Sequence, residues 1–207
     1  MRIKINIQIF AIIAIFIITK QIEIYAYLML FALIHELAHM LAGLLLKMKP
    51  KALEISGFGI SIVFEGYNNI QKNKILIPIA GPAFNFLIAF IFQFIHIKTQ
   101  QVIVNSNLLL AIGNLIPIYP LDGGRILKLF IRKYKTSEET EFVTNRISNV
   151  LMILLTIIAS ILIMLYKNIG ILLIIAYLWI LVINENKKYN LKQRIYKILD
   201  QNFSKST

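Results

Sequence analysis

The sequence contains no cysteine, and only 10 of its 207 residues are acidic. Without cysteine there is no disulfide framework, and the redox compartment is left open. The 22 lysines and arginines give a formal net charge of +12, a value also found in nucleic-acid-binding proteins. Here, however, the positive charge is spread over short segments between apolar stretches rather than gathered on a soluble domain. We therefore exclude nucleic acid as a partner and interpret the charge as a sign of membrane topology.

Apolar runs without charge dominate the chain. Hydrophobic residues make up 58% of it, and its mean hydropathy is +0.73. This composition excludes an ordinary soluble fold and predicts an all-α polytopic protein of the cell membrane, with the lipid bilayer as a partner. The first apolar stretch lacks a small-residue cleavage site and is expected to be retained as a helix. We expect one membrane domain over residues 1–185 and a short basic cytoplasmic tail over residues 186–207.

Hydropathy predicts six transmembrane helices. Since a span needs about 20 apolar residues, the first, fourth and sixth are short. The fifth and sixth are separated by only two residues, so they are expected to form a tight helical hairpin. The six predicted spans are Ile3–Thr19, Ile24–Leu46, Ile75–Ile97, Val102–Ile118, Ile147–Tyr166 and Ile169–Ile183.

Lysine and arginine residues set the predicted orientation. With the N-terminus in the cytoplasm, 19 of the 22 basic residues fall on the cytoplasmic side of the six spans. Lys20, Lys98 and Lys167 fall on the outer side. This asymmetry favours six spans and predicts that both termini are cytoplasmic.

Two segments are not expected to cross the membrane. Ala52–Gly66 is interrupted by glycines, and Ile60, Ile62 and Phe64 alternate with other residues as in a strand. It is interpreted either as a small membrane-associated β-hairpin between the second and third helices or as an amphipathic interfacial loop. Gly124–Lys135 is basic and amphipathic, which predicts that it lies along the cytoplasmic interface.

Three ionisable residues lie inside the second predicted span, in the run His35-Glu36-Leu37-Ala38-His39. Ionisable groups at membrane depth are costly and therefore indicate function. His35 and His39 are four residues apart, so they share one helical face and are about 6 Å apart along the axis. Two imidazoles at this spacing can bind one metal, and Glu36 stands where a general base beside a metal-activated water is needed.

A catalytic zinc needs a third protein ligand and an open position. His96 lies at the outer end of the third span and is expected to be interfacial. Asp122 is the better candidate, since it directly follows an apolar run broken by Pro117 and Pro120. The second and fourth spans run in the same direction, so these ligands are expected to meet in the cytoplasmic half of the membrane, in a site open toward the cytoplasm.

In this order, the segments His35–His39, Gly81–Asn85 and Asn114–Arg125 resemble the site-2 proteases, the intramembrane zinc metalloproteases of peptidase family M50. The length and the six-span layout are most similar to the stage IV sporulation protein FB group. The resemblance covers most of Leu28–Arg125. The CBS domain of that group has no counterpart in these 207 residues.

The resemblance implies a role for each matching residue. His35, His39 and Asp122 are implied to bind Zn²⁺, and Glu36 to act as the base. Asn114 is implied to hold the substrate or polarise its carbonyl, and Pro120 is also expected to contact substrate.

The predicted activity is that of a metalloendopeptidase acting on a membrane-associated or transmembrane protein, with a sporulation pro-sigma factor as one implied substrate. Membrane regulatory proteins are expected as further partners. A substrate helix must unwind before cleavage, and an edge strand of Ala52–Gly66 can hold the extended segment. Two alternatives are a membrane metal transporter and an inactive membrane scaffold. The transporter is disfavoured because the sequence has one metal cluster and no convincing repeat.

Overall fold

A computed structural model describes residues 2–5, 22–56, 59–64, 72–166 and 169–206. The chain divides into two compact units, Met1–Ile116 and Pro117–Thr207. The described helices of the first unit are α2 (Ile22–Leu45), the short 3₁₀ helix η1 (Lys72–Ile75), α3 (Leu76–Phe92) and α4 (Gln100–Leu115). Those of the second unit are α5 (Asp122–Arg132), α6 (Ser137–Tyr166) and α7 (Ile169–Ser206).

Helix α2 ends in a motif that satisfies its last carbonyl groups. The amide of Met48 donates to the carbonyl of Gly43 at 2.9 Å, and the amide of Lys47 donates to that of Leu44 at 2.8 Å. This 6→1 and 5→2 pairing requires a left-handed residue after the helix, and Lys47 has φ 58°. Met48 then folds back and packs with Ile77, which joins the end of α2 to the start of α3.

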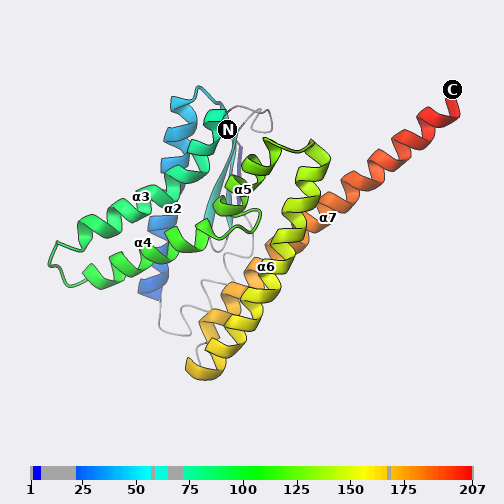
Figure 1. The fold of residues 1–207 in the computed structure, drawn as a ribbon. Helices are drawn as coiled ribbons and strands as arrows, with labels where there is room; N and C mark the ends of the chain where they lie inside the picture. The colour runs from blue at the N-terminus through cyan, green and yellow to red at the C-terminus, as the bar shows by residue number, and fades with distance from the viewer. Residues whose placement is uncertain (1, 6–21, 57–58, 65–71, 167–168, 207) are drawn as a thin grey trace. The chain divides into compact units, whose positions relative to one another are not determined.

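Helix α3 packs against both α2 and α4 in the first unit (Figure 1), and α2 also contacts α4. Helix α3 runs antiparallel to α4, and the side chain of Gln100 donates to the carbonyl of Gln93 at 2.9 Å where the two helices are joined. Ile77, Gly81 and Asn85 recur every four residues and are buried, so they lie on one face of α3.

A three-stranded sheet completes the first unit. It consists of β1 (Arg2–Ile5), β2 (Pro50–Ser56) and β3 (Gly59–Phe64), in the order β1-β2-β3. β2 pairs antiparallel with β3, within the segment for which a hairpin or a loop was predicted, and β3 lies against α2. Residues 57–58 and 65–66 of that segment lie outside the described residues.

Strand β1 corrects the first predicted span. Residues 3–5 were expected to begin a transmembrane helix, but they pair in parallel with residues 53–55 of β2. The physical reason is the alternation of Arg2 and Lys4 with Ile3 and Ile5, a period of two that favours a strand over a helix. Residues 6–19 of the predicted span lie outside the described residues.

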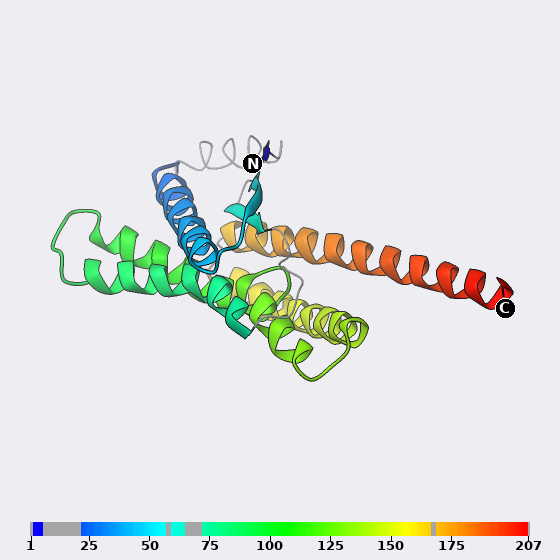
Figure 2. The same cartoon turned by 90° about the horizontal axis from the view of Figure 1, so that it is seen from above.

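The second unit is built on an antiparallel pair of helices, α6 and α7, with α5 packed against α6 (Figures 1 and 2). Thr136 and Glu139 form a capping box at the start of α6, each side chain accepting the backbone amide of the other. The helix therefore begins about ten residues before the predicted span. Helix α7 continues past residue 185, so the described part of the predicted tail is helical.

Two of the described helices, α2 and residues Ser137–Leu165 of α6, are long and apolar enough to cross a membrane. Helix α3 is a shorter apolar helix. These elements agree with a helical membrane protein, and the count of six spans stays a prediction.

Candidate metal site

Helix α2 brings His35 and His39 together on one face. Their ring centroids are 4.6 Å apart, with the ring planes nearly perpendicular at 87°. A nitrogen of one ring lies within 4.8 Å of a nitrogen of the other. Both side chains are buried, with exposed fractions of 3% and 2%. The expected pairing at positions i and i+4 is therefore present in a buried setting.

Gly81 of α3 faces this histidine pair. A Cβ atom built at Gly81 would lie 2.5 Å from Nε2 of His35 and 2.5 Å from Nε2 of His39. Real Cβ contacts are essentially never that short, so any side chain at this position would force the rings or the helix to move. The missing side chain therefore lets both Nε2 atoms lie close to the backbone of α3.

The other ring nitrogen of His39 is held by the main chain. Nδ1 of His39 lies 2.6 Å from the carbonyl oxygen of Ile77, in a buried hydrogen bond. Because a carbonyl oxygen can only accept, Nδ1 carries a proton, and in the neutral ring Nε2 then carries the lone pair. This is the tautomer that a metal-binding histidine needs, with the outer partner that such histidines usually have.

Glu36 is adjacent to His35 in α2 and is also buried, with 8% of its surface exposed. A carboxylate in the middle of an apolar helix has no structural need to be there, because α2 could bury an apolar residue at lower cost. Its position next to the first histidine is the one from which a general base acts in metalloproteases with this motif.

Asp122 is the first residue of α5 in the second unit, and 4% of its surface is exposed. A carboxylate in the first turn of a helix is favoured by the helix dipole. The guanidinium of Arg125, one turn further on, lies 3.7 Å from the Asp122 carboxylate. Gly124 allows the preceding loop to pack onto this turn, since a Cβ there would lie 2.3 Å from the backbone nitrogen of Tyr119. Asp122 is thus a buried carboxylate with a nearby positive charge, and its oxygens are suited to bind a metal.

The remaining candidate residues are less enclosed. Asn114 is half-buried in the last turn of α4, where its side-chain nitrogen donates to the carbonyl of Leu110 at 3.0 Å. Pro120 is half-buried in the segment before α5. His96 is exposed in the connection between α3 and α4.

The histidine pair fits zinc chemistry. A neutral imidazole with an outer hydrogen-bond partner, as in His39, and a nearby carboxylate are what a catalytic zinc requires. Sequence reasoning missed the contributions of Ile77 and Gly81. For Gly81, the available signal was a glycine in the middle of an apolar helix.

Comparisons with known proteins agree with this chemistry. Residues 96–158 match the sequence profile of peptidase family M50. The solved structure of the site-2 protease from Methanocaldococcus jannaschii is similar with a TM-score of 0.70 and 24% sequence identity, covering 88% of this chain and 89% of that one. The chain is therefore a helical membrane protein with the fold of that site-2 protease, and its residues 96–158 are similar to peptidase family M50.

Two particular relatives extend the match. Stage IV sporulation protein FB of Bacillus subtilis is 32% identical over 113 residues, which cover 51% of this chain and 39% of the relative. A Synechocystis protein named "Putative zinc metalloprotease" is 32% identical over 115 residues, which cover 50% of this chain and 30% of the relative. The chain thus spans well under half the length of the curated relatives it matches.

Proposed function

We propose that the protein is a zinc-dependent intramembrane endopeptidase that hydrolyses a peptide bond of a membrane-associated or transmembrane protein. The observation that carries this proposal is the buried histidine pair of α2, whose Nε2 atoms both lie against Gly81, where α3 carries no side chain. The relation to peptidase family M50 supports the same activity.

In this proposal His35, His39 and Asp122 bind Zn²⁺ and leave a fourth position open. Zinc, when bound, supplies the Lewis acidity that makes water a nucleophile near neutral pH and polarises a carbonyl. Glu36 accepts a proton from the attacking water and then donates it to the nitrogen of the leaving amine. The carbonyl of Ile77 keeps the His39 ring in its metal-binding tautomer while this occurs.

The substrate is proposed to bind as an extended segment. Strand β3 is an edge of the described sheet, and it lies against α2, the helix that carries the histidine pair. A substrate that has left its helical conformation has free backbone groups, and an edge strand offers partners for them. Asn114 and Pro120 are proposed to contact the same segment.

The proposed topology has six spans, with both termini in the cytoplasm and the site open to that side. We propose a membrane-associated pro-protein as the substrate. A sporulation pro-sigma factor is the first candidate to test, because one relative is a sporulation protein. Membrane regulatory proteins are proposed as further partners.

Glu36→Gln tests the activity. Cleavage of a co-expressed tagged pro-protein should fall by roughly 10²- to 10⁴-fold, as expected for loss of a general acid–base, while the zinc content stays unchanged. Glu23→Gln is the matched control, since Glu23 is exposed in the first turn of the same helix. This variant should cleave the pro-protein as the wild type does. Undiminished cleavage by Glu36→Gln would remove Glu36 from the mechanism, and zinc uptake into proteoliposomes without proteolysis would favour a transporter.

A further inference from the structure

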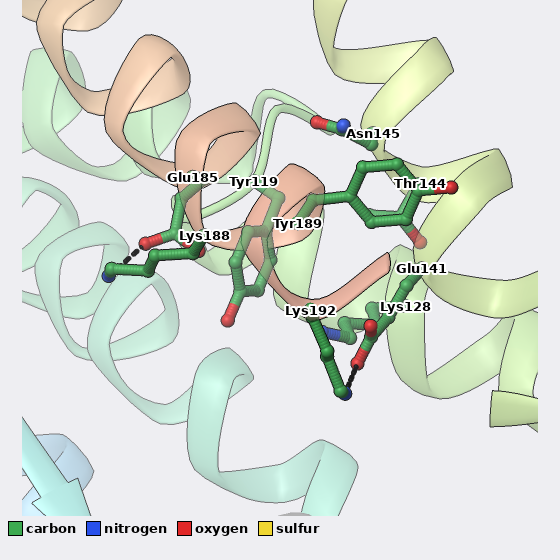
Figure 3. Close-up of a pocket in the computed structure, with 9 residues that line it drawn as sticks. All are labelled: Tyr119, Lys128, Glu141, Thr144, Asn145, Glu185, Lys188, Tyr189 and Lys192. Atoms are coloured by element: carbon green, nitrogen blue, oxygen red, sulfur yellow. Dashed lines mark hydrogen bonds and ion pairs between the residues drawn. The ribbon is translucent and has the colours of Figure 1, made fainter. Parts of the chain in front are cut away.

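The second unit contains a cavity of about 120 Å³, lined in part by charged side chains, that the proposed proteolysis does not use (Figure 3). It is lined by residues of the segment before α5 and of α5, α6 and α7. Its charged and phenolic lining residues are Tyr119, Lys128, Glu141, Glu185, Lys188, Tyr189 and Lys192.

Three lysines line the cavity but only two glutamates, so one positive charge has no acidic partner in the lining. Glu141 pairs with Lys192 at 2.6 Å, and Glu185 pairs with Lys188 at 2.5 Å, as the dashed lines in Figure 3 show. Lys128 is the third lysine, and among the described residues it forms no ion pair. Its ammonium lies 4.6 Å from the centroid of the Tyr119 ring. The lining therefore favours a ligand with negative charge.

Burial makes that surplus charge costly. Desolvation lowers the pKa of Lys128 below its ordinary value, which means that the cation is incompletely solvated where it lies. An aromatic face compensates a cation only in part. An anion in the cavity would supply the missing counter-charge. Its hydrogen bonds with the ammonium would be strong, because both partners are charged.

The position of the cavity relative to the apolar parts of α6 and α7 points to a membrane lipid as the source of the anion. Asn186 of α7 donates to Asn149 of α6 at 2.9 Å, close to where both helices change from polar to apolar. Beyond this pair, residues 150–166 of α6 and 169–183 of α7 contain no charged side chain. Several large apolar side chains there are exposed, as expected for contact with acyl chains: Ile153, Leu154, Ile157, Ile158 and Ile161.

The cavity lies on the polar side of that boundary. Thr144 and Glu141 are five and eight residues before Asn149, or about 8–12 Å along α6. This is about the depth of the headgroup region next to the hydrocarbon core, and basic pockets between helices at this level recognise lipid headgroups.

We propose that this cavity binds the phosphate of an anionic phospholipid, with the Lys128 ammonium as its counter-charge and the Tyr119 hydroxyl as a hydrogen-bond donor. The backbone amide of Tyr119 donates to Oγ of Ser148 at 2.9 Å, so the segment that carries this hydroxyl is anchored to α6. Tyr119 precedes Asp122 by three residues, and a bound headgroup therefore restrains the segment that leads to a proposed zinc ligand.

Lipid retention tests the proposal without any measurement of proteolysis. The full chain is reconstituted in phosphatidylcholine nanodiscs with and without phosphatidylglycerol, and retained lipid is counted by native mass spectrometry. The wild-type chain should retain one phosphatidylglycerol in preference to phosphatidylcholine. Lys128→Gln should weaken this retention about fivefold, the effect of one lysine beside an anionic lipid.

Lys133→Gln is the matched control, because Lys133 is exposed at the end of the same helix and also lies over a tyrosine ring, at 5.4 Å. It should retain phosphatidylglycerol as the wild type does. Tyr119→Phe keeps the ring under Lys128 and removes only the hydroxyl, so it should weaken retention by roughly twofold to fivefold, the value of one hydrogen bond.

Equal weakening by Lys128→Gln and Lys133→Gln would overturn the proposal, since it would indicate general attraction to an anionic surface. Displacement of phosphatidylglycerol by millimolar inorganic phosphate would overturn the lipid as occupant and indicate a site for free phosphate. If Lys128→Gln does not fold, wild-type retention by Tyr119→Phe would still count against the cavity.

Discussion

The first unit buries polar groups in the middle of apolar helices, whereas the second unit collects charged groups on the polar parts of its helices. His35 and His39 are almost fully buried in α2, and a main-chain carbonyl and a missing side chain of α3 arrange them. In the second unit, Glu141 and Lys192 pair through flexible side chains on the polar halves of α6 and α7. A neutral imidazole held by the backbone, as in His39, is tolerated at membrane depth, while ion pairs are placed where water and headgroups can solvate them.

The largest expected effect is the loss of metal when the buried pair is broken. His39→Ala should lower zinc affinity by more than about 100-fold, since even outer-shell changes cost up to that much. Metal content after dialysis against a chelator measures it. His96→Ala, which removes an exposed histidine, should retain zinc, and stoichiometric zinc in His39→Ala would exclude His39 as a ligand. Asp122→Ala tests the proposed third ligand in the same assay.

The second effect isolates the role of the missing side chain. Gly81→Ala places a methyl group 2.5 Å from both Nε2 atoms, so zinc affinity should fall by roughly 10- to 100-fold while all proposed ligands remain. In contrast, a Cβ at Gly113 of α4 meets nothing within 4 Å. Gly113→Ala should therefore bind zinc normally and stabilise the helix by up to about 1 kcal/mol. Equal zinc affinities for the two variants would show that the close approach at Gly81 has no bearing on the metal.

The smallest effect probes the side-chain connections of the second unit. Ser148 and Ser160 of α6 both donate to the carbonyl four residues earlier, but only Ser148 also accepts the backbone amide of Tyr119. Ser148→Ala leaves that amide without its acceptor and should lower the free energy of unfolding in detergent by about 1–2 kcal/mol. Ser160→Ala should change the free energy of unfolding by no more than roughly a few tenths of a kcal/mol. A similar loss in both variants would mean that the bond to Tyr119 adds nothing.

The four-residue spacing of His35 and His39 predicted that two imidazoles share one face of a helix, and α2 confirms that placement. Local periodicity sufficed here because positions i and i+4 always share a face. The contribution of Ile77 was not predictable, because a carbonyl is present at every residue and only tertiary packing selects which one meets His39. The strand at residues 2–5 was also missed, since a long apolar run outweighed a short alternation that a partner strand stabilises.

The boundaries of α6 were set by signals that hydropathy does not register. Thr136 and Glu139 form a capping box, and the polar residues that follow belong to the helix although they cannot belong to a membrane span. A scale that scores burial in lipid therefore finds the apolar part of a helix and misses its polar extension. The cavity beside Lys128 lies in that extension, which is why the sequence offered no sign of it.

The partner of His39 is an atom that genetics cannot delete. Every residue placed at position 77 presents the same carbonyl oxygen as Ile77, so side-chain replacements there leave the acceptor intact. A saturation screen for loss of zinc would score this position as tolerant of other apolar residues, although its oxygen sets the protonation of a proposed metal ligand. Mutational tolerance at position 77 therefore measures how well a side chain packs and carries no information about the chemistry supplied there.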